Sequence, residues 1–515
     1  PRKASSPFGR IIKSLGQPGE LNTEMHAIMH DYSFPEDFPL DVINYTQRIS
    51  TKIEENQISA RRDFRKKTTF TIDPVTAKDF DDAISYAPLA GGRTEIGIHI
   101  ADVSHYVKPN SILDEEAYER ATSVYLVDRV VPMLPELLSN GVCSLRPREE
   151  KFTFSAVFVL NDKMVIEEEW FGKTLIYSDH RFTYEDAQNV IEQKKGKFVD
   201  EILLMNQIAK KMRAKRIKEG AITFDRVEVK FRLDKDNNPS GVYFKQAMDA
   251  NELIEEFMLL ANRSVASFIG KKMDGTPSYK PFVYRVHDIP DPDKIATFLT
   301  FVKQFGHQIT MKTPKDISNS MNRILSDISG KREEHLVELL AIRTMSKAKY
   351  TTENIGHYGL GFNYYTHFTS PIRRWPDVMV HRLLQSYLDG DKVNNKEVIE
   401  EQCKHSSEME KLSTDAERSS IKYMQVKYLL GKEGQEFDAL ISGVTEFGIF
   451  VELQDSLCEG LVSMRDISDD HYVLQKEIFS LVGRKTGHKF QLGDPIRVRV
   501  RNVDLVKKQL DFELV

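Results

Sequence analysis

The chain of 515 residues has little cysteine and no long apolar run. Its three cysteines, Cys143, Cys403 and Cys458, are widely spaced, which excludes a zinc knuckle and indicates a reducing compartment. No apolar stretch approaches the ~18 residues of a membrane span, and residues 1–3 lack the apolar core of a secretory signal. We therefore expect a cytoplasmic protein with no membrane partner. A start at Pro1 also suggests a fragment of a longer chain.

An overall basic charge is missing too, because the formal net charge is −5 at pH 7. A nucleic acid would have to be bound by local basic patches. The candidates are residues 61–67 and the basic half of the C-terminal region, which contains Arg484, Lys485, Lys489, Arg497, Arg499 and Arg501. The alternative for each patch is a solvated face of mixed charge.

Three common catalytic motifs are also absent from the sequence. It has no Gly-rich phosphate loop with a lysine, no Gly-x-Ser-x-Gly elbow and no His-Glu-x-x-His pair. These absences argue against a P-loop NTPase, a serine hydrolase of the nucleophile-elbow type and a zincin. A reaction centre, if there is one, must use other groups.

With 40% hydrophobic and 29% charged residues, the chain should fold into two to four globular domains of mixed α+β class. Apolar residues at three-and-four spacing predict a helix over 249–269 and another over 333–348. Further helical patterning covers 20–31, 178–218, 375–389 and 396–430. Short alternating strands at 8–12, 437–441, 448–453, 496–500 and 509–514 complete the pattern, and the last four predict a small closed β-barrel.

Four aspartates, Asp73, Asp79, Asp81 and Asp82, lie within ten residues after an apolar strand end. Carboxylates this close repel one another, so a fold keeps them ionised only with a cation among them. Ligands that are all oxygen suit a hard ion such as magnesium or manganese, which points to phosphate chemistry. The alternative is a solvated acidic turn, but the flanking apolar residues and the internal Phe80 argue against it.

Other side chains are candidates for holding RNA. Tyr125 and Phe224 are aromatics on which bases could stack, although such residues more often belong to a core. Arg373 and Arg374 precede a predicted helix, where they would hold phosphate or else pair with an acid such as Asp377. Glu417 lies on the long polar helix, where a solvated ion pair is the default.

Taken together, the motifs resemble the ribonuclease II/R (RNB) family of exoribonucleases, and most of all its bacterial ribonuclease R branch. The matching stretch begins with Asp73-Pro-Val-Thr-Ala-Lys-Asp79-Phe-Asp81-Asp82. It continues in order through residues 99–106, 123–135, 140–145, 251–262, 284–290, 354–361 and 367–374. One departure is Trp375, where the family commonly has tyrosine.

The resemblance implies four parts. Residues 1–45 would be the remnant of an N-terminal cold-shock (OB-type) domain, most of which is missing. Residues 46–392 would be an RNB catalytic domain around a channel for one RNA strand. Residues 393–431 would be a helical connector, and residues 432–515 an OB-fold RNA-binding domain of the ribosomal-protein type.

The resemblance also implies an activity: metal-dependent, processive 3′-to-5′ hydrolysis of single-stranded RNA with a free 3′ end, by a monomer that releases nucleoside 5′-monophosphates. The cofactor would be Mg, as one or two ions, with Mn as a substitute. Three groups of residues would carry this activity: Asp73, Asp79, Asp81 and Asp82 for the metal; Asp81, Asp82 and Arg373 for catalysis; and Tyr125, Phe224, Arg373, Arg374 and Glu417 for RNA. Two alternatives are a non-catalytic RNA-binding scaffold and an endonuclease or phosphatase that uses the same carboxylates.

Overall fold

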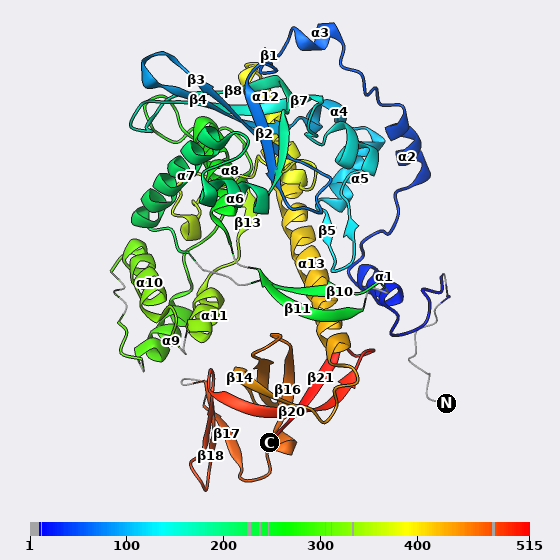
Figure 1. Cartoon of the computed structure of the whole chain (residues 1–515), viewed down its shortest axis with the longest axis vertical. Helices are drawn as coiled ribbons and strands as arrows, with labels where there is room; N and C mark the ends of the chain where they lie inside the picture. The colour runs from blue at the N-terminus through cyan, green and yellow to red at the C-terminus, as the bar shows by residue number, and fades with distance from the viewer. Residues whose placement is uncertain are drawn as a thin grey trace.

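The computed structural model describes residues 10, 11, 13–223, 228–235, 238–245, 247–303, 305–308, 310, 312–331, 334–475 and 479–515. A large part built on a mixed sheet is joined by one long helix to a β-barrel (Figure 1). This mixture of helices and sheets confirms the predicted α+β class.

Seven strands form the central sheet, in the order β1-β8-β7-β4-β3-β2-β9. They are β1 (Arg62–Asp63), β2 (Thr68–Asp73), β3 (Asp82–Pro88), β4 (Thr94–Ala101), β7 (Glu150–Leu160), β8 (Ile166–Tyr177) and β9 (His180–Thr183). β4 and β7 are buried along nearly their whole length, which explains their almost continuous apolar sequences. Because β2 and β3 are antiparallel, the end of β2 and the start of β3 lie at the same edge of the sheet.

Helices pack around this sheet, and α8 (Asp249–Gly270) is among the most deeply buried of them. Its bounds confirm the helix predicted over 249–269. The others in this core are α2 (Leu40–Gln47), α4 (Val103–Tyr106), α5 (Ile112–Arg120), α6 (Tyr184–Gln193), α7 (Val199–Glu219) and α12 (Trp375–Leu388). The short helix α3 (Glu55–Ile58) has no buried residue, and α9 (Pro292–Lys303), α10 (Pro314–Ile328) and α11 (Glu334–Thr344) pack together in a separate hydrophobic cluster. Single turns occur at η1 (Ala90–Gly92), η3 (Tyr358–Leu360) and η4 (Met464–Asp466), and η2 (Leu137–Val142) is a π-helix.

Two helix predictions need correction. The segment 178–218 is not one helical region, because β9 occupies its start and a capping box at Thr183 begins α6. The helix predicted to reach residue 348 ends at Thr344, since the chain then enters β13 (Lys349–Thr351), which pairs with β12 (Tyr284–Val286).

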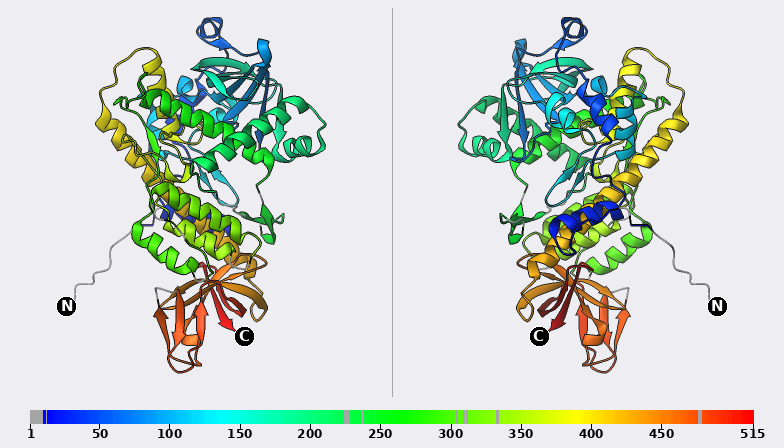
Figure 2. Two further views of the ribbon diagram at one scale, coloured as in Figure 1. Left: turned by 90° about the vertical axis from the view of Figure 1, so that its left-hand side faces the viewer. Right: turned by 90° about the vertical axis from the view of Figure 1, so that its right-hand side faces the viewer.

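The helix α13 (Lys396–Leu429) has 34 residues, so it is roughly 50 Å long, and it reaches the barrel. In Figure 2 the first helix, α1 (Leu21–Asp31), runs beside the lower part of α13. One hydrophobic cluster joins α1 to α13 and to β5 (Val124–Tyr125), which pairs with β6 (Val130–Val131). The cluster contains Met25, Ile28, Val124, Leu126, Ala416 and Tyr423.

The C-terminal barrel closes in the order β14-β15-β16-β21-β20, as its alternating strands predict. Its strands are β14 (Glu436–Thr445), β15 (Gly448–Leu453), β16 (Glu459–Ser463), β20 (Pro495–Asp504) and β21 (Gln509–Leu514). At the first hairpin turn, Gly448 has φ +146° and a Cβ there would lie 2.1 Å from the Val462 carbonyl oxygen, so only glycine fits. A three-stranded sheet extends the barrel: β17 (Tyr472–Gln475), β18 (Ser480–Gly483) and β19 (Lys489–Gln491).

The last strand pair is β10 (Glu228–Leu233) with β11 (Pro239–Lys245), and β11 packs near α13. Most of the strand predicted at 8–12 falls outside the described residues, and Arg10 and Ile11 are not in a strand. No helix in the described part of the chain is long and apolar enough to cross a membrane.

Candidate active site

The four predicted aspartates lie around the junction of β2 and β3. Asp73 ends β2, Asp82 begins β3, and Asp79 and Asp81 belong to the loop between them. Burial raises the pKa of Asp73 to about 6 and that of Asp81 to about 7. Burial, reinforced by the charges of Asp73 and Asp81, raises the pKa of Asp82 well above its usual value. The fold thus brings together carboxylates that resist ionisation as long as no cation is present.

A divalent cation fits this cluster. The Oδ2 atom of Asp73 is buried and has no hydrogen-bond partner, so it is an oxygen still available to a ligand. Across the described residues, no three Asp, Glu, His or Cys side chains are close enough to share one ion. Magnesium commonly uses one or two carboxylates together with water and substrate phosphate, so pairs within this cluster suffice.

The loop before α12 brings Arg373 to the aspartates. The Ile372 amide donates to Oδ1 of Asp81 at 2.9 Å, and Nε of Arg373 donates to Oδ2 at 3.3 Å. A second guanidinium nitrogen of Arg373 donates to the Ser370 hydroxyl at 3.0 Å, yet the side chain is 43% exposed. Arg373 is therefore held in place with part of its guanidinium open to a phosphate.

Arg374 has a different environment from its neighbour. Its guanidinium donates to the buried carboxylate of Asp377 at 2.8 Å, and the Ser370 amide donates to the same oxygen at 2.7 Å. This is the alternative that the sequence left open: Arg374 holds the start of α12 together. The prediction that Arg374 contacts RNA finds no support in this packing.

Tyr125 lies beside the same cluster. The Ser123 amide donates to the Arg373 carbonyl at 3.0 Å, which ties the start of β5 to the arginine loop. Burial raises the pKa of the Tyr125 hydroxyl, with Arg373, Asp79 and Asp81 among the charges that act on it. The residue as a whole is still 40% exposed, so part of its ring remains available for stacking.

Glu417 reaches the site from α13. Its Oε1 atom accepts the Tyr125 amide proton and the Ser413 hydroxyl proton, both at 3.2 Å. Burial raises the pKa of Glu417. The solvated ion pair expected by default is thus replaced by a contact with the tyrosine strand. Phe224 lies outside the described residues.

Two residues near the aspartates were not predicted from the sequence. Arg181 donates to the carbonyls of Pro74 and Val75 at 2.5 and 3.1 Å, and its charge lowers the pKa of Asp73. The Tyr184 hydroxyl has its pKa raised by burial and by the charges of Asp82 and Asp73. Neither has a sequence signal, because an arginine in a short strand and a tyrosine in a first helical turn are ordinary.

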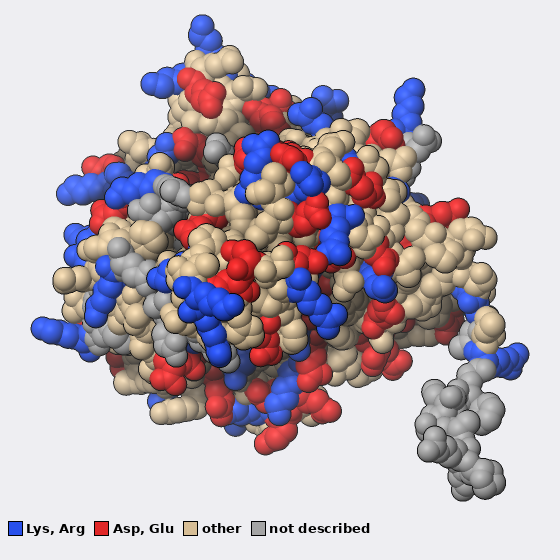
Figure 3. Space-filling model, turned by 90° about the horizontal axis from the view of Figure 1, so that it is seen from below, with Lys and Arg blue, Asp and Glu red and all other residues tan. Residues whose placement is uncertain are grey.

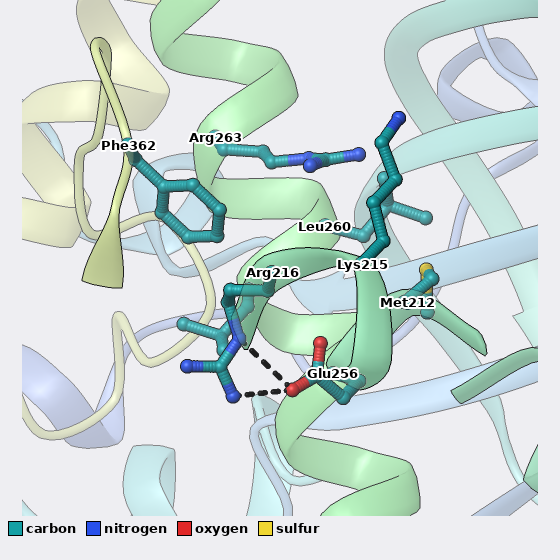
Figure 4. Close-up of a pocket in the computed structure, with 8 residues that line it drawn as sticks. Met212, Lys215, Arg216, Glu256, Leu260, Arg263 and Phe362 are labelled. Atoms are coloured by element: carbon teal, nitrogen blue, oxygen red, sulfur yellow. Dashed lines mark hydrogen bonds and ion pairs between the residues drawn. The ribbon is translucent and has the colours of Figure 1, made fainter. Parts of the chain in front are cut away.

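A cavity of about 30 Å³ lies between α7, α8 and the loop that carries Phe362 (Figure 4). Arg216 and Glu256 face one another in it, with Nε of Arg216 3.1 Å from the carboxylate. None of its lining residues belongs to the carboxylate cluster. Because its lining has a single carboxylate, that of Glu256, which is already paired with Arg216, this cavity is not the reaction centre.

Most arginines of the two predicted basic patches are paired with acidic side chains. In residues 61–67, Arg61 pairs with Asp102, Arg62 with Glu95 and Arg65 with Asp63. In the barrel the pairs are Arg497 with Glu436 and Asp438, Arg499 with Glu436 and Glu513, and Arg501 with Asp466. Seen from below, basic and acidic side chains interleave (Figure 3). The mixed-charge alternative is therefore correct for these arginines.

Three family models match the chain: the RNB domain over residues 61–390, the S1 RNA binding domain over 431–514 and the cold shock domain over 1–39. Ribonuclease R of Aquifex aeolicus is 37% identical over all of this chain and 73% of its own length. Ribonuclease R of Escherichia coli is 30% identical over all of this chain and 65% of its own length. Ribonuclease R 1 of Lactococcus lactis is 35% identical over 98% of this chain, which spans 62% of that protein.

Solved structures agree with these matches. Mycoplasma genitalium RNase R, in complex with ribose methylated single-stranded RNA, superimposes with a TM-score of 0.90 at 28% identity, over 97% of this chain and 79% of that one. Yeast Ssd1, a pseudonuclease, has a TM-score of 0.73 at 20% identity over 93% of this chain and 60% of its own, which shows the fold alone.

The fold and the carboxylate site define a hydrolytic nuclease with an RNB core and an S1 barrel. The chain belongs to the RNB family of 3′-to-5′ exoribonucleases and is similar over its whole length to its ribonuclease R members. Nucleases of this family depend on divalent metal ions.

Proposed function

We propose that this chain degrades single-stranded RNA processively from a free 3′ end, as a cytoplasmic monomer that releases nucleoside 5′-monophosphates. Mg²⁺, as one or two ions and with Mn²⁺ as a substitute, would be held by Asp73, Asp79, Asp81 and Asp82. The observation that supports this best is the meeting of the aspartates with Arg373, which comes from a segment almost 300 residues away.

A divalent cation held by these aspartates would neutralise charge on the scissile phosphate and acidify an attacking water. The protein side chains do the rest. Arg373, fixed by Asp81, offers its open guanidinium to a phosphate oxygen and stabilises charge that develops there. Because Asp81 already accepts two protein hydrogen bonds, its orientation is set before the substrate arrives.

Tyr125 and Glu417 would hold the last nucleotide. The partly exposed Tyr125 ring is placed to stack on a terminal base, a contact worth roughly 1–3 kcal/mol. Glu417 fixes the strand that carries this ring through the Tyr125 amide. Preference for RNA over DNA would come from contacts with the ribose 2′-hydroxyl.

The experiment is digestion of 5′-labelled single-stranded RNA with Mg²⁺ or with EDTA, alongside a circular RNA of the same sequence. We expect Mg²⁺ to give successive shortening from the 3′ end, EDTA to stop it, and the circle to remain intact. Cutting of the circle would favour an endonuclease. RNA that is bound but unchanged in Mg²⁺ would favour the non-catalytic scaffold, which the fold alone permits, since the pseudonuclease shares it.

A further inference from the structure

A single buried hydroxyl holds the loop that carries Asp79. Ser144 has no exposed surface, and its Oγ donates to the Lys78 carbonyl at 2.8 Å and accepts the Phe80 amide proton at 3.0 Å. The next amide, that of Leu145, donates to the Phe80 carbonyl at 3.0 Å. The peptide groups on both sides of Asp79 are thereby fixed by one short segment.

This matters because the four aspartates are supported differently. Asp73 and Asp82 lie in strands, and the Asp81 carboxylate accepts from Ile372 and Arg373. Asp79 lies in the loop between the two strands. The direction of its Cα–Cβ bond follows from the backbone dihedrals between residues 78 and 80, which the Ser144 hydroxyl clamps.

The segment that presents Ser144 is itself anchored. It follows the π-helix η2, in which the Cys143 amide donates to the Leu138 carbonyl at 3.0 Å. The Lys151 ammonium donates to the carbonyls of Gly141 and Val142 at 2.7 and 3.3 Å. A hydroxyl can donate and accept at once, whereas alanine would leave a buried amide and a buried carbonyl unpaired.

We propose that Ser144 is a positioning residue that orients the Asp79 carboxylate for a divalent cation. The proposal rests on the proposed function only in taking Asp79 as a metal-holding carboxylate. Removal of a residue that holds a metal ligand in place typically lowers metal affinity or activity by about 10–100-fold. Ser144 should behave as such a residue although it touches neither metal nor RNA.

The test compares Ser144→Ala with Ser139→Ala. Ser139 is a matched control, because it is buried in the π-helix just before Ser144 but its hydroxyl donates to the Pro135 carbonyl and not to the aspartate loop. Binding of Mn²⁺ to the metal-free full chain is followed by electron paramagnetic resonance, and exchange of the Phe80 amide by hydrogen–deuterium exchange. If the alanine variant does not fold, Ser144→Cys replaces it in the comparison. Cysteine has nearly the same shape as serine but is a weaker donor and acceptor.

We expect Ser144→Ala to raise the Mn²⁺ dissociation constant by about 10–100-fold and to speed exchange at Phe80, with a smaller effect for Ser144→Cys and none for Ser139→Ala. Wild-type Mn²⁺ affinity in the Ser144 variants would overturn the proposal. Asp79→Asn separates the role of Ser144 from the role of Asp79. If this variant also binds Mn²⁺ like wild type, Asp79 does not hold the metal. If Asp79→Asn loses Mn²⁺ binding and the Ser144 variants do not, only the proposed role of Ser144 is wrong.

Discussion

Two acidic sites at the same sheet meet opposite electrostatic surroundings. At the end of β4, Asp102 is fully buried and accepts from Arg61 at 2.7 Å, from Ser104 at 2.9 Å and from Lys173. Burial alone would raise its pKa, but Lys173 and Arg61 outweigh burial and hold the pKa well below the usual value. At the β2–β3 junction, burial outweighs the charge of Arg373 and the hydrogen bond from Ile372, and the pKa of Asp81 rises to about 7.

The difference separates structural carboxylates from functional ones. Asp102 is neutralised by the protein, so its charge holds the sheet together and is not available for a ligand. The β2–β3 cluster has more negative side chains than nearby cations, and this excess charge is what a metal ion and its phosphate can use. Burial alone would not distinguish the two sites; the count of cations around each carboxylate does.

The largest effect is expected from Asp81→Asn. Several kcal/mol of charge stabilisation should be lost, so single-turnover cleavage should fall by about 10³-fold, while RNA affinity stays within about threefold. Thermal stability should hold or rise, because one repelling charge is gone. Rapid-quench kinetics measures the cleavage rate, and calorimetry measures the thermal stability. Near wild-type cleavage in Mg²⁺ would remove Asp81 from the reaction centre.

The opposite pattern is expected from Asp102→Asn. Removing this charge leaves Lys173 and Arg61 buried without a counter-charge, which should cost about 3–5 kcal/mol of unfolding free energy. Urea denaturation measures this loss. At a temperature where the variant is folded, its cleavage rate should stay close to wild type. A large loss of cleavage with unchanged stability would contradict the comparison.

The adjacent arginines sharpen the contrast. Arg373→Ala should slow single-turnover cleavage by about 10²-fold or more with little change in stability, and Arg373→Lys should recover only part of the rate. Arg374→Ala should instead destabilise the protein by leaving the buried Asp377 carboxylate without a counter-charge. If both alanine variants lost rate and stability to the same extent, the two roles would not be separable.

The smallest effect that we expect is a pH dependence of stability caused by His99, which is buried in β4. His99 bonds to Ser155 and Ser85 at 2.6 and 2.8 Å, and burial lowers its pKa to about 3. Since its unfolded pKa is about 6.5, the folded state binds fewer protons between these values and loses stability as pH falls, by about 2 kcal/mol between pH 7.5 and 5. His99→Gln should remove this part of the pH dependence, which urea denaturation at pH 7.5 and pH 5 measures. An identical pH dependence in the variant would show that His99 is not held neutral.

Periodicity predicted the elements whose burial is local in the sequence. α8 shows three-and-four spacing because its apolar residues are buried in the core that it shares with the sheet, α6 and α7. The barrel strands were found for the same reason. The sequence left open whether the barrel arginines are neutralised, because this depends on which residues face each other: Arg499 opposite Glu436 and Arg497 opposite Asp438.

The residues of the candidate site also divide into those that the sequence reveals and those that it does not. The aspartate cluster is contiguous, so its charge density is visible in the sequence. Arg181 and Ser144 act on that loop from distant segments through backbone carbonyls and amides, and such contacts leave no pattern of residue types. The four domain boundaries, the roles of the site residues and the ion count remain predictions.

The bond between Tyr125 and Glu417 runs through the tyrosine backbone and not through its ring. The neighbours Val124 and Leu126 are anchored in the cluster with α1 and α13, so this strand stays in place whatever side chain occupies position 125. The side chain at position 125 can therefore be changed while the backbone that carries it stays in place. Residues other than proline should be tolerated there without rebuilding the surrounding fold, so such exchanges would test the proposed stacking role through the length of the last undigested fragment.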